Sequence, residues 1–199
     1  MDKKIMKMQS IRFLLPVYIV LILVIFILPY YSAEGYSIFK HTTSHLGAQN
    51  TPNAWIMNIV FCLLGIACIF EGLFHLKQYW GHKILLTIFG VGLILAAIFQ
   101  HAPIVEDIPY NLSEDNMHSL FATIVGFSFT IFAISAAFIE RTNTKRILAL
   151  LVGLIATSLS ILMYSVIDFA GLWQRLMFII SFAWLIFFFE GMRIEEEKN

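Results

Sequence analysis

The segment ILALLVGLIATSLSILMYSVI, residues 147–167, decides the fold class, because it runs for 21 residues without one charged side chain. An α-helix rises 1.5 Å per residue, so about 20 apolar residues cross the ~30 Å hydrocarbon core of a bilayer. In lipid the backbone must satisfy its own hydrogen bonds, which a helix does within one segment. The segment is therefore predicted to be a transmembrane helix.

Five further apolar runs have the same character, so the sequence predicts an all-α bundle of six transmembrane helices. The predicted spans are residues 11–31, 55–76, 83–100, 118–139, 147–167 and 172–190. Of the 199 residues, 59% are hydrophobic and 13% are charged, whereas soluble domains carry about 25% charged residues. We expect a single transmembrane domain, residues 1–199, that is a multi-pass protein of the cell membrane.

The basic residues predict the orientation of the bundle. With the N-terminus in the cytoplasm, eleven of the thirteen Lys and Arg residues fall in cytoplasmic segments, and only Lys40 and Arg175 fall outside. The positive-inside rule therefore predicts that both termini are cytoplasmic and that the long loops 32–53 and 100–117 are extracytoplasmic. The net charge of zero suggests no nucleic-acid partner.

Small residues recur on one face of the fourth span, and they predict a helix-packing surface. They are Ser119, Thr123, Gly126, Thr130, Ala133 and Ala137. Small side chains let helix backbones approach each other in lipid, so we expect the face around Gly126 to pack closely on a neighbour. At the span starts, Thr51 is predicted to cap the second helix, and Ser113 and Asp115 to precede the fourth.

Polar side chains gather at the predicted extracytoplasmic ends of the spans. The binding-pocket candidates are Ser44, His45, Asn58, His118, Asp168 and Arg175. Polar groups at that depth face protein or water, since in lipid they would be unpaired. The loop 32–53 exceeds the 2–8 residues that helix connections usually need, so we expect it to roof a polar pocket. In the alternative interpretation, the same groups pair with one another and hold the loop to the bundle.

Four histidines at this end are candidate zinc ligands, because imidazole and carboxylate are usual zinc ligands. They are His41, His45, His101 and His118, with Asp107 or Asp168 assisting. His41 and His45 would share a helix face if residues 37–46 were helical and ended at Gly47. A metal lowers the pKa of bound water and supplies a nucleophile. No ligand spacing here is diagnostic, so no cofactor is assigned and zinc is kept as an alternative.

Charged side chains near the span ends are predicted to pair. The predicted pairs are Glu71–His75 and Glu190–Arg193 within their own helices, and Asp168–Arg175 between the last two spans. If Asp168 does not pair with Arg175, the guanidinium is available for another anion, for example a lipid phosphate.

The stretch Ser44-His45-Leu46-Gly47, followed by Pro52, Trp55, Asn58 and Gly65, resembles the signature of the domain of unknown function family 998. His118 and the stretch Gly171-Leu172-Trp173-Gln174-Arg175 also fit that family of small six-helix membrane proteins. The residue after Ser44 is more often acidic in the family, so His45 departs from its pattern. The resemblance implies a six-helix fold but no activity. A more distant likeness to eukaryotic membrane proteins that remodel glycolipid anchors hints at lipid handling.

Three functions remain open from the sequence, and whether the chain is an enzyme is not decided. The first is binding or handling of a membrane lipid or amphiphile through Ser44, Asn58, His118 and Arg175. The second is a metal-dependent intramembrane hydrolase that uses the four histidines. The third is a non-catalytic membrane subunit or regulator with an unspecified protein partner.

Overall fold

The structure is a computed structural model that describes residues 12–105 and 107–198. Within these residues six helices are long and apolar enough to cross a membrane, as predicted, and there is no strand. The three lysines at positions 3, 4 and 7, which contribute to the predicted orientation, lie outside the described residues. The elements are α2 (Leu14–Ile27), η1 (Leu28–Tyr31), α3 (Thr43–Leu46), α4 (Ala54–His75), α5 (Trp80–Ile98), α6 (Leu112–Ala136), α7 (Asn143–Ser165), η2 (Ile167–Phe169) and α8 (Ala170–Lys198).

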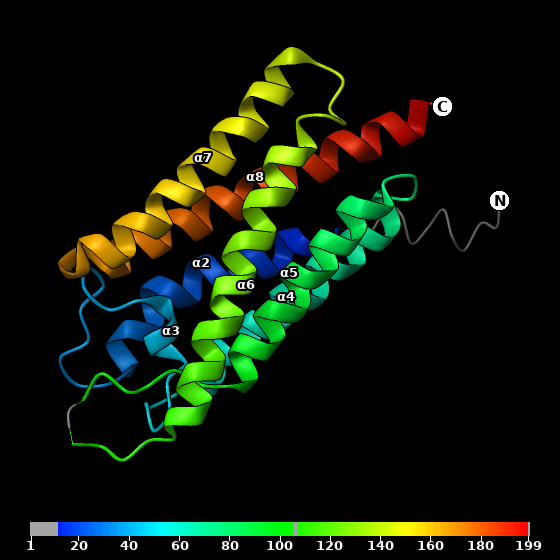
Figure 1. The fold of residues 1–199 in the computed structure, drawn as a ribbon. Helices are drawn as coiled ribbons and strands as arrows, with labels where there is room; N and C mark the ends of the chain where they lie inside the picture. The colour runs from blue at the N-terminus through cyan, green and yellow to red at the C-terminus, as the bar shows by residue number, and fades with distance from the viewer. Residues whose placement is uncertain (1–11, 106, 199) are drawn as a thin grey trace.

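The long helices pack mainly in chain order, from α4 beside α5 through to α7 beside α8, and α2 packs against α4 and α8. In Figure 1, α6 crosses between the α4–α5 pair and the α7–α8 pair. The segments 32–53 and 99–111 and the short helix η2 gather at one end of the bundle, which we call the loop end (Figure 1). The turns 76–79 and 137–142 lie at the other end, which we call the terminal end.

Helix α6 begins earlier than predicted. It starts at Leu112, six residues before the predicted start at 118, because Asn111 caps it. The Asn111 side-chain oxygen accepts the amides of Ser113 and Glu114 at 3.0 and 3.4 Å. Ser113 and Asp115 therefore lie in the first turn of the helix, and the prediction that they precede it is wrong.

Helix α4 also begins differently from the prediction. Its N-cap is Asn53, which has a left-handed backbone with φ of 59° and makes no side-chain capping bond. Thr51 instead accepts the Ala54 amide through its backbone oxygen at 3.2 Å. Thr51 thus takes part in the turn before the helix, and the prediction that it is the N-cap is wrong.

Small residues bring α4 and α5 together, whereas Gly126 of α6 has a different role. A Cβ on Gly65 would overlap the carbonyl oxygen of Gly90, and a Cβ on Gly90 would overlap that of Gly65. This is the close approach that small residues permit. A Cβ on Gly126 would meet nothing within 4 Å. The prediction that Gly126 packs closely on a neighbour is wrong, although Ala133, on the same face, is fully buried.

A buried charge network closes the terminal end. Arg193 donates to both carboxylate oxygens of Glu71, at 2.9 and 2.7 Å. The same carboxylate accepts the backbone amides of residues 13–14 at the start of α2, where the helix dipole favours a negative charge. The predicted Glu71–His75 and Glu190–Arg193 pairs are both present, at 3.4 and 2.9 Å. The network therefore joins α2, α4 and α8.

Candidate functional site

The candidate site lies at the loop end and begins with α3, which is a single helical turn. The backbone N–H and hydroxyl of Thr42 donate to Nδ1 of His45 at 3.1 and 2.7 Å. His45 thus takes the place of the Glu or Gln of a capping box. Gly47 ends the turn as predicted, but residues 37–42 are not helical. The condition under which His41 and His45 would share a helix face, a helix over residues 37–46, is therefore not met.

The four candidate histidines nevertheless lie together, and they form a row. The ring centroids of His41 and His45 are 5.7 Å apart, those of His45 and His101 are 4.6 Å apart, and those of His101 and His118 are 5.1 Å apart. We call these four side chains the histidine row. It leads from the loop, across the end of α5, to the second turn of α6.

Hydrogen bonds at Nδ1 determine which nitrogen of His118 carries the proton in the neutral ring. Nδ1 lies 2.7 Å from the carbonyl oxygen of Ala96 and 3.0 Å from that of Phe99. Carbonyl oxygens only accept hydrogen bonds, so the proton is on Nδ1 and Nε2 keeps its lone pair. His118 is 4% exposed. It therefore presents a hydrogen-bond acceptor to its surroundings.

The loop histidines have the opposite arrangement and remain uncharged at neutral pH. Nδ1 of His45 accepts from Thr42, and Nδ1 of His41 accepts the Ser37 amide at 2.9 Å. Burial, followed by the neighbouring imidazoles, lowers the pKa of His45 from 6.5 to about 3. Burial also lowers the pKa of His41, and the positive charges of Lys40 and Arg175 act in the same direction.

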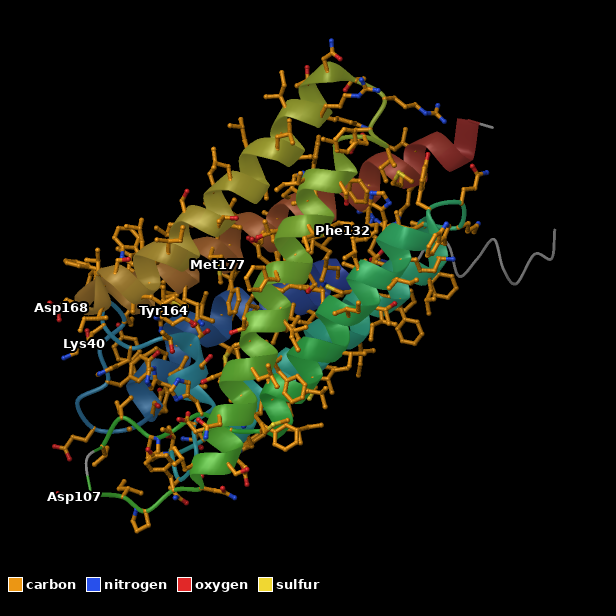
Figure 2. The ribbon with its side chains drawn as sticks, viewed as in Figure 1. Lys40, Asp107, Phe132, Tyr164, Asp168 and Met177 are labelled. Atoms are coloured by element: carbon orange, nitrogen blue, oxygen red, sulfur yellow. The ribbon has the colours of Figure 1, made fainter. Side chains whose placement is uncertain are left out.

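The histidine row is not arranged as a metal centre. Among the residues that the structure describes, no three His, Cys, Asp or Glu side chains are placed to hold one metal ion. The proposed assisting carboxylates are remote, since Asp107 lies at an exposed loop tip and Asp168 projects from the edge of the bundle (Figure 2). Zinc therefore stays a prediction from the sequence.

Arg175 is buried beneath the loop rather than paired with Asp168. Its side chain is 1% exposed. It donates to the carbonyl oxygens of Ile25, Ile38, His41 and Gly171 and to the hydroxyl of Tyr36, at 2.8–3.2 Å. The Asp168 side chain is exposed, so the predicted Asp168–Arg175 ion pair is wrong. The guanidinium holds the loop to α8 and to the end of α2.

Two further residues let the loop lie against the bundle. Gly171 lies in the first turn of α8 rather than in a turn between helices, and a Cβ there would overlap the carbonyl oxygens of His41 and Ile38. Asn58 of α4 donates to the carbonyl oxygen of Gly47 at 3.1 Å. Asn58 and Arg175 therefore both hold the loop to the bundle.

A cavity of about 450 Å³ lies between α6, α7 and α8, beneath α3. Of the six binding-pocket candidates, Ser44 and His118 line it, while His45, Asn58, Asp168 and Arg175 do not. Gln174 of α8 also lines it, although sequence reasoning did not select this residue. Its helical spacing could have indicated the role, because Met177 and Phe178, three and four residues later, line the same cavity.

The cavity extends deep between the helices and opens at the surface of the bundle. From His118 to Thr130 it follows twelve residues of α6, or about 18 Å. Phe127 of α6 and Tyr164 of α7 line it and are 67% and 72% exposed. Figure 2 shows Tyr164 and Met177, on α7 and α8, beside the region that α6 crosses. The cavity can therefore be reached from the side, between α6 and α7, at the depth of the membrane.

Fold and site define a polytopic α-helical membrane protein with a laterally open, largely apolar cavity that ends in polar side chains. A family model described as "Protein of unknown function (DUF998)" matches residues 17–189, and the chain belongs to this family. The match confirms the family that the Ser44 motif resembles. Neither the curated proteins nor the solved structures contain a match to the chain.

Proposed function

We propose that this protein binds an amphiphile of the membrane, with the apolar chain of that molecule in the cavity between α6, α7 and α8. The observation that carries the proposal is the cavity itself, which is apolar along α6 and opens sideways between two membrane-spanning helices. Its volume of about 450 Å³ falls within the range of about 300–1,000 Å³ that ligand pockets usually have.

The position of the opening supports a ligand that comes from the bilayer. An acyl chain that enters between Phe127 and Tyr164 exchanges contacts with lipid for contacts with apolar side chains. It does not have to pass the loop 32–53, which Arg175 holds against the bundle. The polar end of the molecule then meets Ser44, His118 and Gln174. We place the loop end on the extracytoplasmic face of the cell membrane, as the Lys and Arg distribution favours. A reporter fused at Gln49 should read extracytoplasmic and one at Asn143 cytoplasmic; the reverse readings would contradict this orientation.

Photo-crosslinking in native membranes tests the proposal. Two probes, hexadecanol and palmitate, each carry a diazirine at mid-chain, and the labelled residues are mapped by peptide sequencing. We expect either probe, or both, to label residues 122–130 of α6 and 157–164 of α7 above the other lipid-exposed helix faces.

Two glycine variants provide a matched comparison. A Cβ on Gly126 and a Cβ on Gly81 both meet nothing within 4 Å, but only Gly126 lines the cavity. Gly126→Leu should fill the cavity and remove the preferential labelling, whereas Gly81→Leu should leave it unchanged. Labelling that is uniform over α2 to α8 with both probes, or that survives Gly126→Leu, would overturn the proposal.

A further inference from the structure

Most of the polar groups in the deep part of the cavity are already satisfied by the protein. Thr157 donates to the Gly153 carbonyl oxygen at 2.8 Å and pairs with Thr130 at 3.3 Å. The Ser160 hydroxyl contacts the sulfur of Met177 at 3.3 Å. These side chains therefore offer little to a polar ligand, and the deep part of the cavity suits a hydrocarbon chain.

At the loop end of the cavity, three buried side chains have hydrogen-bonding capacity to spare. Within the described residues, the Ser44 hydroxyl, Nε2 of His118 and the side-chain nitrogen of Gln174 make no hydrogen bond. The Gln174 oxygen accepts from Thr43, so the amide nitrogen is the free end. The three groups supply a hydroxyl, an acceptor and a donor.

Charged side chains are absent from the part of the cavity lining that the structure describes, since no Asp, Glu, Lys or Arg belongs to it. Two charges lie nearby, and both are engaged elsewhere. Asp115 accepts the Ala102 amide at 2.8 Å and lies 3.2 Å from Nδ1 of His101. Arg175 donates to backbone oxygens and to Tyr36. A charged head group in this cavity would lose its hydration without gaining an ionic partner.

We infer that the ligand is an amphiphile with an uncharged head group that offers both a hydroxyl and a second oxygen acceptor, as a monoacylglycerol does. The inference rests on the proposed function and specifies its ligand class. The ligand hydroxyl donates to Nε2 of His118, the ligand carbonyl or ether oxygen accepts from the Gln174 amide, and the Ser44 hydroxyl completes the set. The cavity therefore selects against phosphate, carboxylate and quaternary ammonium head groups.

Competition with matched head groups tests the inference. The competitors share one oleoyl or oleyl chain and are 1-oleoylglycerol, its di-O-methyl ether, oleoyl lysophosphatidic acid and oleyltrimethylammonium. Each competes with the photoactivatable hexadecanol probe in vesicles at pH 7.5, and its amount is expressed as the mole fraction in the bilayer. This scale removes differences in partitioning.

We expect 1-oleoylglycerol to displace the probe at a mole fraction at least about tenfold lower than either charged competitor, because the charged heads lose hydration. Methylation of both hydroxyls should raise the required mole fraction roughly fivefold, as expected for the loss of one net hydrogen bond. Ser44→Ala should reduce the preference for 1-oleoylglycerol over the ether. This variant removes no hydrogen bond within the described part of the protein, because the Ser44 hydroxyl makes none and its backbone carbonyl keeps the bond from the Gly47 amide.

The outcomes separate the inference from the proposed function. If a charged competitor displaces the probe as well as 1-oleoylglycerol does, or if only the palmitate probe labels the cavity, the neutral-head inference is overturned and the proposed function stands. If neither probe labels the cavity, both are overturned. If the ether competes as well as 1-oleoylglycerol, the assigned hydroxyl contact is wrong and the inference fails.

Discussion

Oε1 of Gln174 on α8 accepts two hydrogen bonds of 2.6 Å from Thr43 on α3, one from the backbone N–H and one from the hydroxyl. The backbone amide can only donate, so the atom that it meets must be the oxygen of Gln174. The contact attaches the loop to α8 and turns the amide nitrogen of Gln174 away from Thr43. The position of the loop and the orientation of Gln174 at the polar end of the cavity therefore depend on the same contact.

Gln174→Glu should separate the structural role of this side chain from its role in binding. A glutamate keeps an oxygen acceptor for Thr43 but brings a negative charge to the cavity. We expect the variant to fold and its preferential crosslinking to fall by about tenfold, because no Lys or Arg among the described residues lines the cavity to offset the charge. Labelling as strong as in the unmodified protein would show that Gln174 does not face the ligand.

Arg193→Met should lower the thermal stability far more than Arg12→Met does. Arg193 is bound to the fully buried Glu71, and removal of one partner of a buried pair costs about 3–5 kcal/mol. Arg12 makes an exposed pair with Glu190 at 2.7 Å, and such pairs contribute about 0–1 kcal/mol. Thermal melting in detergent compares the two variants. Equal shifts in melting temperature would mean that the Glu71 network does not hold the terminal end together.

Arg175→Lys should loosen the segment 36–41 although the charge is retained. Lysine has three donors on one atom, so it cannot reproduce the spread of bonds that the guanidinium makes to Ile38, Gly171 and Tyr36. We expect faster amide hydrogen exchange in residues 36–41 and little change elsewhere. Asp168→Asn, at an exposed site, is the control and should leave the exchange unchanged. Faster exchange in the Asp168→Asn control would instead show that Asp168 does interact with Arg175, contrary to the structure.

Acidification should destabilise the loop end through His45. Its folded-state pKa of about 3 lies below the ordinary value of 6.5, so the unfolded chain binds the proton first. The stability contributed by the neutral ring is complete above pH 6.5 and is lost as the pH falls toward 3. His41, His101 and His118 face the ring and act in the same direction.

The control for this pH effect is His45→Gln, which keeps the capping-box type of residue but cannot titrate. Between pH 6.5 and 4, the melting temperature of the unmodified protein should fall more steeply than that of the variant. Parallel curves would show that His45 does not contribute to the pH dependence.

The transmembrane helices could be predicted because their signal is local. A run such as 147–167 carries its own length and polarity, and each backbone must form its hydrogen bonds within the segment. The helix starts were harder to predict, because several polar residues compete to cap each helix. In the structure the N-caps are Asn111, two residues before Ser113, and Asn53, two residues after Thr51.

The candidate site could be predicted only in part, because it depends on directions that the sequence does not encode locally. The position of His118 at a span end and of Ser44 in the loop predicted to roof the pocket could be read from the sequence, and both residues line the cavity. Arg175 has the same depth but turns toward the loop carbonyl oxygens, and the sequence contains no signal for acceptors that belong to the backbone. Gly126 shows the same limit, since a small residue permits either a close helix contact or an open space.

Native mass spectrometry of the protein released from mild detergent tests the central claim most directly. The unmodified protein and Gly81→Leu should each carry one bound amphiphile of uncharged head group, which dissociates on collisional activation. Gly126→Leu should fold normally, because its side chain enters open space, and should carry none. If the unmodified protein carries no bound amphiphile of any kind, or if Gly126→Leu carries the same molecule at the same occupancy, the cavity does not hold a membrane amphiphile.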